Sequence, residues 1–249
     1  MTTYLITGAT GRIGTPTTAQ LRAQGHDVRA LSRRTGPGLV AGDLLSGSGV
    51  EGAMAGVDTV IHLATTNGAK DIQIAENLFS AAASAHVRHV VLLSIVGIDK
   101  IPMGFYKQRL AIESIATESG VPLTLQRSTQ FHTFVDTLFS AQRFLPVLIA
   151  PSIRFQPIAT QEVAARLVTL AAGESSGRVD DIGGPQQRTA ADLLAAWKDA
   201  RGSRRPGMPL RLPGKAFNAV AAGNNLAAGT PFGHETFDQY LAQKYQSGR

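Results

Sequence analysis

Three glycines near the start of the chain have a spacing that suits an anion-binding turn. Gly8, Gly11 and Gly14 recur at every third position in GATGRIG (8–14), directly after the apolar run TYLIT (3–7). A tight turn between a strand and a helix leaves backbone N–H groups unpaired, and these groups together with the helix dipole attract an anion. Glycine is needed there for positive φ and for close approach of the backbone to a pyrophosphate. The turn therefore predicts nucleotide binding, with a glycine-rich turn that binds nothing as the alternative.

Two arginines at the end of the next apolar segment indicate which dinucleotide would bind. Residues 27–33 (DVRALSR) form a predicted strand that ends at Arg33, and Arg34 follows it. NAD sites usually place a carboxylate here on the ribose 2′-hydroxyl, whereas a guanidinium pairs with a 2′-phosphate. Arg12, inside the glycine turn, adds positive charge. The pattern favours NADPH/NADP⁺ over NADH, with a solvated arginine pair as the alternative.

The elements that must position these residues follow a strand–helix alternation. Strands are expected at 3–7, 27–33, 39–43, 58–65, 88–96 and 122–128, and helices at 12–24, 50–56, 70–86 and 105–119. The apolar strands are continuous rather than alternating, which is typical of a parallel sheet covered on both faces. Right-handed crossovers then predict an α/β fold with a doubly wound, Rossmann-like parallel sheet.

The second half of the chain has a different pattern and predicts a small C-terminal α+β cap that binds substrate. We expect an NADP-binding core over 1–130 and a cap over 131–249, partly interleaved with the core in one compact unit. Helices are expected at 134–144, 160–172, 190–200, 215–222 and 234–245, and extended segments at 149–159, 180–185 and 209–213. Thr189, with Asp192 three residues later, is expected to cap the helix at 190–200.

The overall composition excludes several kinds of protein. The chain has 249 residues, 43% of them hydrophobic and none of them cysteine, which excludes disulfides, thiolate catalysis and cysteine-ligated metals. The absence of cysteine fits a cytoplasmic protein, and the N-terminus lacks the pattern of a signal peptide. No apolar stretch approaches the ~20 residues of a membrane span. No histidines and carboxylates have the spacing of metal ligands, so we expect no metal site.

The charge is basic but does not indicate nucleic acid. The formal net charge is +6 and the pI is about 10. Basic residues are densest between Lys198 and Lys215, where no aromatic residues interleave with them and prolines and glycines break the group. A solvated basic loop is the interpretation that we adopt, with a phosphate-binding face as the alternative.

Several short motifs together resemble the NmrA-like branch of the atypical short-chain dehydrogenase/reductase superfamily of NAD(P)-binding proteins. The motifs are GATGRIG (8–14), AGD (41–43), HLAT (62–65), LLSIVGID (92–99), LQRSTQFH (125–132) and IGGPQQRTAADL (182–193). The resemblance implies that the strand ends hold the dinucleotide through Gly8, Thr10, Gly11, Arg12, Ile13, Gly14 and Arg33, with Asp43 and Leu44 beside the adenine, Leu63, Ala64 and Thr65 along the ribose, and Ser94 and Ile95 near the nicotinamide. It also implies that Ser128, Thr129, Gln130 and Phe131 border both cofactor and substrate.

The catalytic pair that the resemblance implies is broken in this chain. Short-chain reductases use Tyr-x-x-x-Lys on one helix face, where the ammonium lowers the tyrosine pKa. Here Arg109 stands at the lysine position, Phe105 lies four residues before it, and Tyr106 is displaced by one residue. An arginine does not transfer protons, but it can hold a ribose hydroxyl or a phosphate of the cofactor. An exposed ion pair between Arg109 and Glu113 is the alternative.

His132 is the best alternative proton donor, because imidazole titrates near neutrality. The alternative is a packed loop histidine. Tyr106 and Arg109 remain the other catalytic candidates, and His132 is also a candidate for substrate binding. His62 lies within an apolar strand and is expected to be a satisfied core residue.

These observations predict an NADPH-dependent oxidoreductase that reduces a small, largely apolar electrophile, such as a quinone, enone or aromatic ketone, without a Tyr–Lys dyad. A non-catalytic NADP-binding redox sensor or regulator is one alternative, and a cofactor-retaining isomerase or cyclase is another. The expected partner is a small-molecule substrate rather than a membrane or a nucleic acid. The protein is expected to be a monomer or a homodimer.

Overall fold

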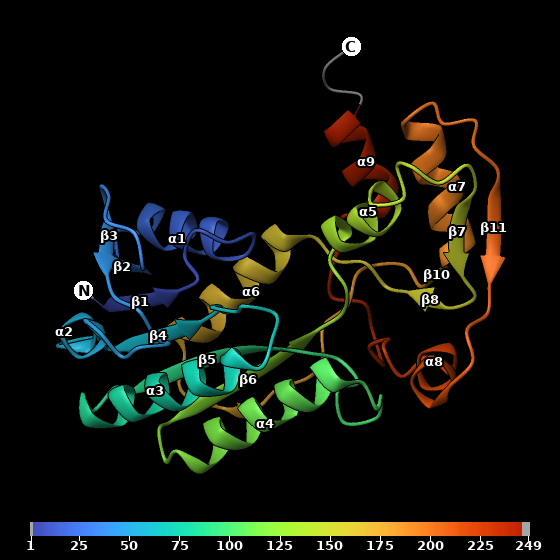
Figure 1. The fold of residues 1–249 in the computed structure, drawn as a ribbon. Helices are drawn as coiled ribbons and strands as arrows, with labels where there is room; N and C mark the ends of the chain where they lie inside the picture. Colours follow the sequence, from blue (N-terminus) through green and yellow to red (C-terminus); the bar gives the residue numbers. More distant parts are fainter. Residues whose placement is uncertain (1, 246–249) are drawn as a thin grey trace. The chain divides into compact units, whose positions relative to one another are not determined.

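The computed structural model describes residues 2–245, which form two units of packed residues (Figure 1). The first unit contains the chain up to Ser94, then Gly104–Arg127 and Thr160–Asp180. The second contains Ile95–Met103, Ser128–Ala159 and the chain from Asp181 onward. The division at residue 130, with cofactor bound before it and substrate after it, stays a prediction about function.

The first unit is built on a seven-stranded sheet in the order β3-β2-β1-β4-β5-β6-β9. Its strands are β1 (Thr3–Thr7), β2 (Asp27–Ser32), β3 (Leu39–Ala41), β4 (Thr59–His62), β5 (His89–Ile95), β6 (Leu123–Ser128) and β9 (Gly177–Arg178). Strand β1 pairs in parallel with both β2 and β4, and β4 pairs in parallel with β5. The strand order reverses between β1 and β4, where a doubly wound sheet binds its ligand. The predicted Rossmann-like parallel sheet is confirmed.

Five helices cover this sheet: α1 (Gly14–Ala23), α2 (Val50–Met54), α3 (Lys70–Ser84), α4 (Gly104–Glu118) and α6 (Thr160–Ala172). Helices α1 and α6 pack together on one face, and α3 and α4 pack together on the other (Figure 1). The core between the sheet and the second pair contains Leu5, Val60, Leu78, Val90 and Ile112, all buried. Continuous apolar strands are thus buried on both faces, as expected for a parallel sheet.

Two predicted boundaries at the sheet edge shift for local reasons. The first helix begins at Gly14 rather than at residue 12, because the preceding residues form the glycine turn. The fourth strand ends at His62 rather than at residue 65, because Leu63 and Ala64 donate their N–H groups to the Thr7 side chain, each at 3.1 Å. The Thr7 side chain, at the end of β1, therefore takes the N–H groups that would otherwise continue β4.

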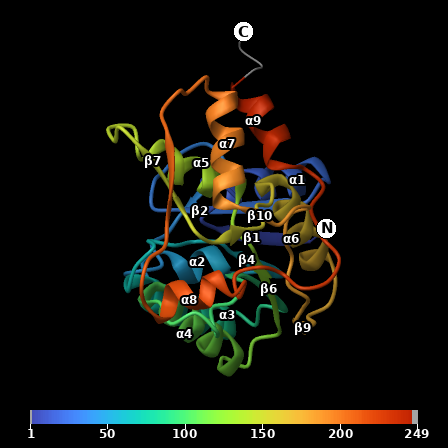
Figure 2. The same cartoon turned by 90° about the vertical axis from the view of Figure 1, so that its right-hand side faces the viewer.

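The second unit contains two small sheets and four helices within the described residues. The helices are α5 (His132–Ser140), α7 (Ala190–Ala200), α8 (Lys215–Ala221) and α9 (Phe237–Tyr245). Strands β8 (Arg154–Phe155) and β10 (Arg188–Thr189) pair antiparallel, and β7 (Leu148–Pro151) and β11 (Gly207–Leu210) pair in parallel. Helices α7 and α9 lie side by side (Figure 2). No helix within residues 2–245 is long and apolar enough to cross a membrane.

The cap at the start of α7 is confirmed, and other boundaries in this half differ. Thr189 Oγ1 accepts the N–H of Asp192 at 3.1 Å. Helix α5 runs over His132–Ser140 rather than 134–144, because a turn follows it in which Arg205 binds the carbonyl of Gln142 at 2.8 Å. The strand expected at 180–185 is reduced to a single parallel bridge between Ile182 and Ser128, and the two-residue strand β9, which the sequence did not predict, extends the edge of the first unit's sheet.

Candidate functional site

The glycine turn after β1 has the close contacts that the sequence predicted. Gly8 has a φ of +65°, and a Cβ added to it would lie 2.7 Å from the Leu63 carbonyl oxygen. A Cβ on Gly14 would lie 2.1 Å from the carbonyl oxygen of Gly8. Backbone therefore packs against backbone on both sides of the turn, and a side chain at either position would force the strand end and the helix start apart.

Unpaired amides line this turn. Among the described residues, the backbone N–H groups of Thr10, Arg12 and Ile13 donate no hydrogen bond. Helix α1 begins after Ile13 without a side-chain cap, so its dipole also faces the turn. Free amides at a helix N-terminus, on backbone that glycine keeps accessible, fit the pyrophosphate of a dinucleotide.

The arginines after β2 are exposed and available to an anion. The guanidinium groups of Arg33 and Arg34 have no partner within the part of the chain that the structure describes, and the same holds for Arg12. The N–H of Arg34 donates to Ser32 Oγ at 3.0 Å, which turns the chain at the strand end. This arrangement suits a 2′-phosphate and a solvated pair equally, so the choice of NADPH stays a prediction.

Asp43 and Leu44 lie in a loop after β3. Asp43 Oδ1 accepts the N–H of Leu45 at 3.0 Å, and the backbone of Asp43 closes a turn with Ser48 at 2.8 Å. Leu44 is buried in the core of the first unit. The loop is thus held in one shape, and the predicted contact of these residues with the adenine is untested.

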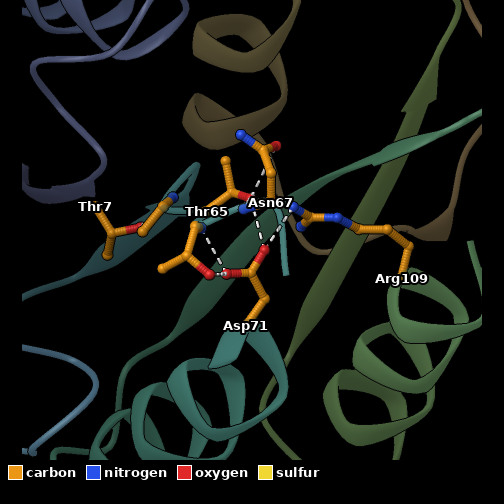
Figure 3. A network of polar contacts seen from close by, with 7 residues as sticks. Thr7, Thr65, Asn67, Asp71 and Arg109 are labelled. Carbon is orange, nitrogen blue, oxygen red and sulfur yellow. Dashed lines mark hydrogen bonds and ion pairs between the residues drawn. The ribbon is translucent and has the colours of Figure 1, made fainter. Parts of the chain in front are cut away.

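A buried ion pair joins Arg109 of α4 to Asp71 of α3 (Figure 3). Arg109 Nη2 lies 2.9 Å from Asp71 Oδ2 and also donates to Thr65 Oγ1, just beyond β4. Asp71 Oδ2 accepts the Thr65 hydroxyl at 2.6 Å. Asp71 Oδ1 accepts the Thr66 N–H at 2.6 Å and the Thr66 hydroxyl at 2.7 Å. The network therefore fixes the Arg109 side chain against the end of β4.

The expected alternative for Arg109, an exposed pair with Glu113, is wrong. Glu113 instead accepts two hydrogen bonds from Arg127 of β6, at 2.8 and 2.6 Å, and both side chains are buried. The buried Arg109 and the buried Arg127 are thus paired with different carboxylates, Asp71 and Glu113. The sequence did not predict Asp71 or Arg127, because each lies far along the chain from its partner.

The charges of the Arg109–Asp71 pair stabilise each other. Burial raises the pKa of Asp71. Hydrogen bonds from Thr65 and Thr66 and the charge of Arg109 lower it by more than burial raises it, so the pKa of Asp71 is below its ordinary value. Burial lowers the pKa of Arg109, and the carboxylate of Asp71 raises it. Asp71 is therefore a carboxylate, and Arg109 is a cation, at neutral pH.

The residues around Arg109 on α4 do not restore a catalytic dyad. The Phe105 ring lies under the guanidinium, with its centroid 5.2 Å from the Arg109 carbon Cζ. Burial raises the pKa of Tyr106, so its phenol keeps its proton at neutral pH. A tyrosine beside a lysine would have a lowered pKa instead.

His62 is a satisfied core histidine, as predicted. Its Nδ1 lies 2.8 Å from Thr7 Oγ1, which already accepts the N–H groups of Leu63 and Ala64. The Thr7 hydroxyl therefore donates to Nδ1, and the ring hydrogen is on Nε2. Burial, together with the nearby charge of Arg109, lowers the pKa of His62 to about 4. The ring is neutral at pH 7.

Ser94, the residue predicted to lie near the nicotinamide, is at the end of β5. Its side chain is 4% exposed, and its hydroxyl has no hydrogen-bond partner among the described residues. A buried hydroxyl without a partner is costly, so a ligand that binds it is favoured. Ile95 begins the second unit.

Most of the residues expected to border the substrate are held by the second unit itself. Ser128 forms a parallel bridge with Ile182, and Phe131 forms one with Ile158. Thr129 Oγ1 donates to the carbonyl of Gln156. The Gln130 amide donates to the carbonyl of Asn225 at 3.0 Å. The segment 128–131 is thus ordered by local contacts, and its role toward substrate stays a prediction.

His132 is packed inside the second unit. Its side chain is buried, its Nε2 donates to the Glu235 carbonyl at 3.0 Å, and its ring stacks on Tyr240 at 5.4 Å between centroids. These contacts favour the alternative that the sequence left open, a packed histidine, over a proton donor. No group of three or more metal-ligating side chains lies together within residues 2–245.

Comparison with known proteins agrees with this architecture. Residues 8–120 match a family described as NAD(P)H-binding. The chain is 30% identical over 222 residues to the (4-alkanoyl-5-oxo-2,5-dihydrofuran-3-yl)methyl phosphate reductase of Streptomyces griseus. The aligned residues cover 83% of this chain and 75% of that protein.

Two solved structures have a similar fold. An NADPH-dependent quinone oxidoreductase from Escherichia coli, complexed with NADPH, superposes with a TM-score of 0.79 at 18% identity. The triphenylmethane reductase of Citrobacter sp., complexed with NADP(H), superposes with a TM-score of 0.78 at 17% identity. Each comparison covers 97% of this chain and 99% of the other.

Proposed function

Because the chain belongs to the NAD(P)H-binding family within the atypical short-chain dehydrogenase/reductase superfamily, we propose that it is an NADPH-dependent reductase of a small, largely apolar electrophile. We assign it to the NmrA-like branch of that superfamily on the motifs that the sequence carries. Quinones, enones and aromatic ketones are the electrophiles to consider. A cytoplasmic location and a monomeric or homodimeric state belong to the same proposal.

The observation that carries the proposal is the pairing of a glycine turn with free amides and an exposed arginine at the next strand end. Thr10, Arg12 and Ile13 present N–H groups to a pyrophosphate, and Arg33 presents an unpaired guanidinium to a 2′-phosphate. A bound NADPH supplies a hydride to an electrophilic carbon. Ser94 supplies a hydroxyl at the strand end where the nicotinamide would lie.

The names of the similar proteins support a conjugated carbonyl compound as the acceptor. The Streptomyces relative is named as a reductase of a dihydrofuranone that carries an alkanoyl group and a methyl phosphate group, and the Escherichia coli protein is named as a quinone oxidoreductase. In both, the reducible carbon is conjugated to a carbonyl group. The same chemistry suits a site without a Tyr–Lys dyad, since a conjugated acceptor becomes a stabilised anion when it takes up a hydride.

Calorimetry with NADPH and NADH tests the cofactor part of the proposal. The Arg33→Glu variant should weaken NADPH binding by at least about tenfold, because a charge-assisted hydrogen bond is worth about 1.5–3 kcal/mol. NADH binding should change by less than about threefold. Arg211→Glu, an exposed arginine of the second unit, is the matched control. Equal affinity of the unaltered protein for both dinucleotides would contradict the choice of NADPH.

A redox sensor is the second candidate, favoured by the lack of a phenol–ammonium pair on α4. The two functions differ in turnover. A reductase consumes NADPH in the presence of a quinone or an enone, as measured by the absorbance of the reduced nicotinamide. A protein that binds NADPH tightly and reduces none of these acceptors is a sensor, and the reductase proposal then fails.

A further inference from the structure

We infer that Arg109, held in place by Asp71, acts as a fixed cationic hydrogen-bond donor to the oxygen of the substrate, and that the site reduces only acceptors whose hydride adduct is a delocalised oxyanion. Quinones and enones belong to this class, whereas isolated ketones and aldehydes do not. The inference rests on the proposed function and deepens it, because it names the substrate class and the residue that selects it.

Arg109 has hydrogen-bond donors to spare. All the hydrogen bonds that it forms among the described residues use Nη2, toward Asp71 and Thr65. Its Nη1 and Nε have no partner there, and the side chain is still 11% exposed. A guanidinium carries five N–H donors in a fixed plane, so several remain available to a ligand oxygen.

The free donors lie where a parallel sheet binds its ligand. Thr65 follows the carboxyl end of β4, and Arg109 reaches it from α4 (Figure 3). Ligands of doubly wound sheets bind outside the carboxyl ends of the strands, at the point where the strand order reverses. Strand β4 is one of the two strands at that point. Strand β4 pairs with β5, whose end is expected to lie near the nicotinamide, so Arg109 is one strand away from the expected position of the reacting groups.

Asp71 is a positioning residue rather than a ligand-binding one. Both of its carboxylate oxygens are used, by Arg109 and by Thr65 and Thr66, and its side chain is 2% exposed. Its charge offsets that of Arg109, which lowers the cost of holding a buried guanidinium. Asp71 thereby fixes one edge of the guanidinium and leaves the other edge free.

No neighbour of Arg109 in the first unit is suited to give a proton at neutral pH. His62 is neutral and accepts at Nδ1 from Thr7. Tyr106 has a raised pKa because of burial, which makes its phenol a weaker acid. Both carboxylate oxygens of Glu113 already accept hydrogen bonds from Arg127. A fixed cation can stabilise a developing negative charge without transferring a proton.

The chemistry follows from this lack of an acid. In an enone, a hydride forms a new C–H bond at the β-carbon, the C=C π bond breaks, and its electron pair moves through the conjugated system to the carbonyl oxygen, while NADPH becomes NADP⁺. Arg109 donates to the resulting enolate oxygen, and water later supplies the proton. A quinone gives a phenolate-type anion, whose conjugate acid has a pKa of about 10. An isolated ketone gives an alkoxide, which is far more basic and needs a proton in the same step.

A panel of acceptors tests the substrate class. The NADPH-loaded protein should reduce 1,4-naphthoquinone and 2-cyclohexenone, with kcat/KM at least about 100-fold above that for acetophenone, because the alkoxide has no proton donor. In Arg109→Gln, kcat for the quinone should fall by about 100-fold or more, as for loss of an oxyanion donor. The comparison is made at saturating NADPH, so that it measures turnover rather than cofactor affinity. Lys107→Gln, on the exposed side of α4, is the control and should keep full activity.

A binding measurement without turnover provides a second readout. The NADP⁺-loaded protein is titrated with 4-nitrophenol, whose anion is coloured, and the pH at which the bound phenol ionises is recorded. Bound 4-nitrophenol should ionise at a pH at least about one unit lower than free 4-nitrophenol, which corresponds to about 1.4 kcal/mol of preference for the anion. Arg109→Gln should abolish the shift, and Arg109→Lys should restore part of it. Asp71→Asn should reduce it.

The outcomes separate the two proposals. If the unaltered protein does not bind NADPH, or binds it and reduces no acceptor, the proposed reductase is refuted and this inference with it. Reduction of acetophenone as fast as the quinone refutes the inference alone. So does an Arg109→Gln variant that keeps its kcat and its 4-nitrophenol shift. If Asp71→Asn fails to fold, the Arg109 variants still decide.

Discussion

Acidification should destabilise the first unit through His62. The ring is buried at 3% exposure between β1 and the end of β4, where its Nδ1 accepts the Thr7 hydroxyl. Burial lowers its pKa from 6.5 to about 4, and the charge of Arg109 acts in the same direction. In the unfolded chain the ring keeps a pKa near 6.5. Between these two values the unfolded state binds more protons than the folded state, so the free energy of unfolding must fall as the pH falls.

The size of the effect follows from the two pKa values. A folded pKa of about 4 and an unfolded pKa of 6.5 give a loss of about 2 kcal/mol between pH 7.5 and pH 5. The full loss, reached below pH 4, is about 3 kcal/mol. A change of about 2 kcal/mol is a large part of the net stability of a typical domain. The contribution is fully present above pH 6.5 and disappears through the window from 6.5 to 4.

Urea unfolding at pH 7.5 and pH 5 measures this loss. The control is His62→Gln, which keeps an acceptor for the Thr7 hydroxyl but does not titrate in this range. The other histidines are common to both proteins, so their contribution cancels in the comparison. The unaltered protein should lose about 2 kcal/mol more than the variant between the two pH values. Equal losses in the two proteins, or an NMR titration of His62 with a midpoint near 6.5, would refute the reasoning.

Two further predictions concern the glycine turn and the second unit. Gly14→Ala should lower NADPH affinity by at least about tenfold in calorimetry, because its Cβ would lie 2.1 Å from the Gly8 carbonyl oxygen, whereas Gly52→Ala, with no atom within 4 Å, should leave affinity unchanged. Asp136→Asn should lower the free energy of unfolding by about 2 kcal/mol, because Asp136 is a buried carboxylate that accepts from Trp197 at 2.7 Å and pairs with Lys244 of α9. A urea midpoint equal to that of the unaltered protein would show that this ion pair adds nothing to stability.

The parts of the fold that the sequence predicts are those encoded locally. Residues 3–14 contain a whole strand, turn and helix start, so their pattern alone indicates the anion site. The capping of α7 is equally local, since Thr189 and Asp192 are three residues apart. Strand β9 escaped prediction because it is two residues long, Gly177–Arg178, and has no apolar run. Its place in the sheet depends on β6, which lies far away in the sequence.

The candidate site divides in the same way. Arg109 was found because its position on a helix could be compared with a family motif, but its partner Asp71 lies 38 residues earlier. The only local signal at Asp71 is an acidic residue in the first turn of a helix, which usually serves the helix dipole. Glu113 illustrates the opposite error. It is one helical turn from Arg109 and was the obvious local partner, yet Arg127 from β6 binds it. A cation buried between two elements needs a charge from another element, and spacing along one helix cannot show which.

The replacement of lysine by arginine in α4 has consequences that extend beyond this helix. A lysine in the same place could lose its proton when buried, but a guanidinium stays charged, so its burial requires a carboxylate close by. Asp71 meets that requirement, and it in turn needs the hydroxyls of Thr65 and Thr66 to satisfy its remaining lone pairs. The conformation of Thr65 and Thr66, in the loop after β4, therefore depends on the charge of Arg109 on α4. Restoring the family pair with Phe105→Tyr and Arg109→Lys would leave Asp71 beside an ammonium that it stabilises. An ammonium that is paired with Asp71 would lower the pKa of the introduced tyrosine less than an unpaired ammonium would. The double variant should therefore gain little activity toward isolated ketones.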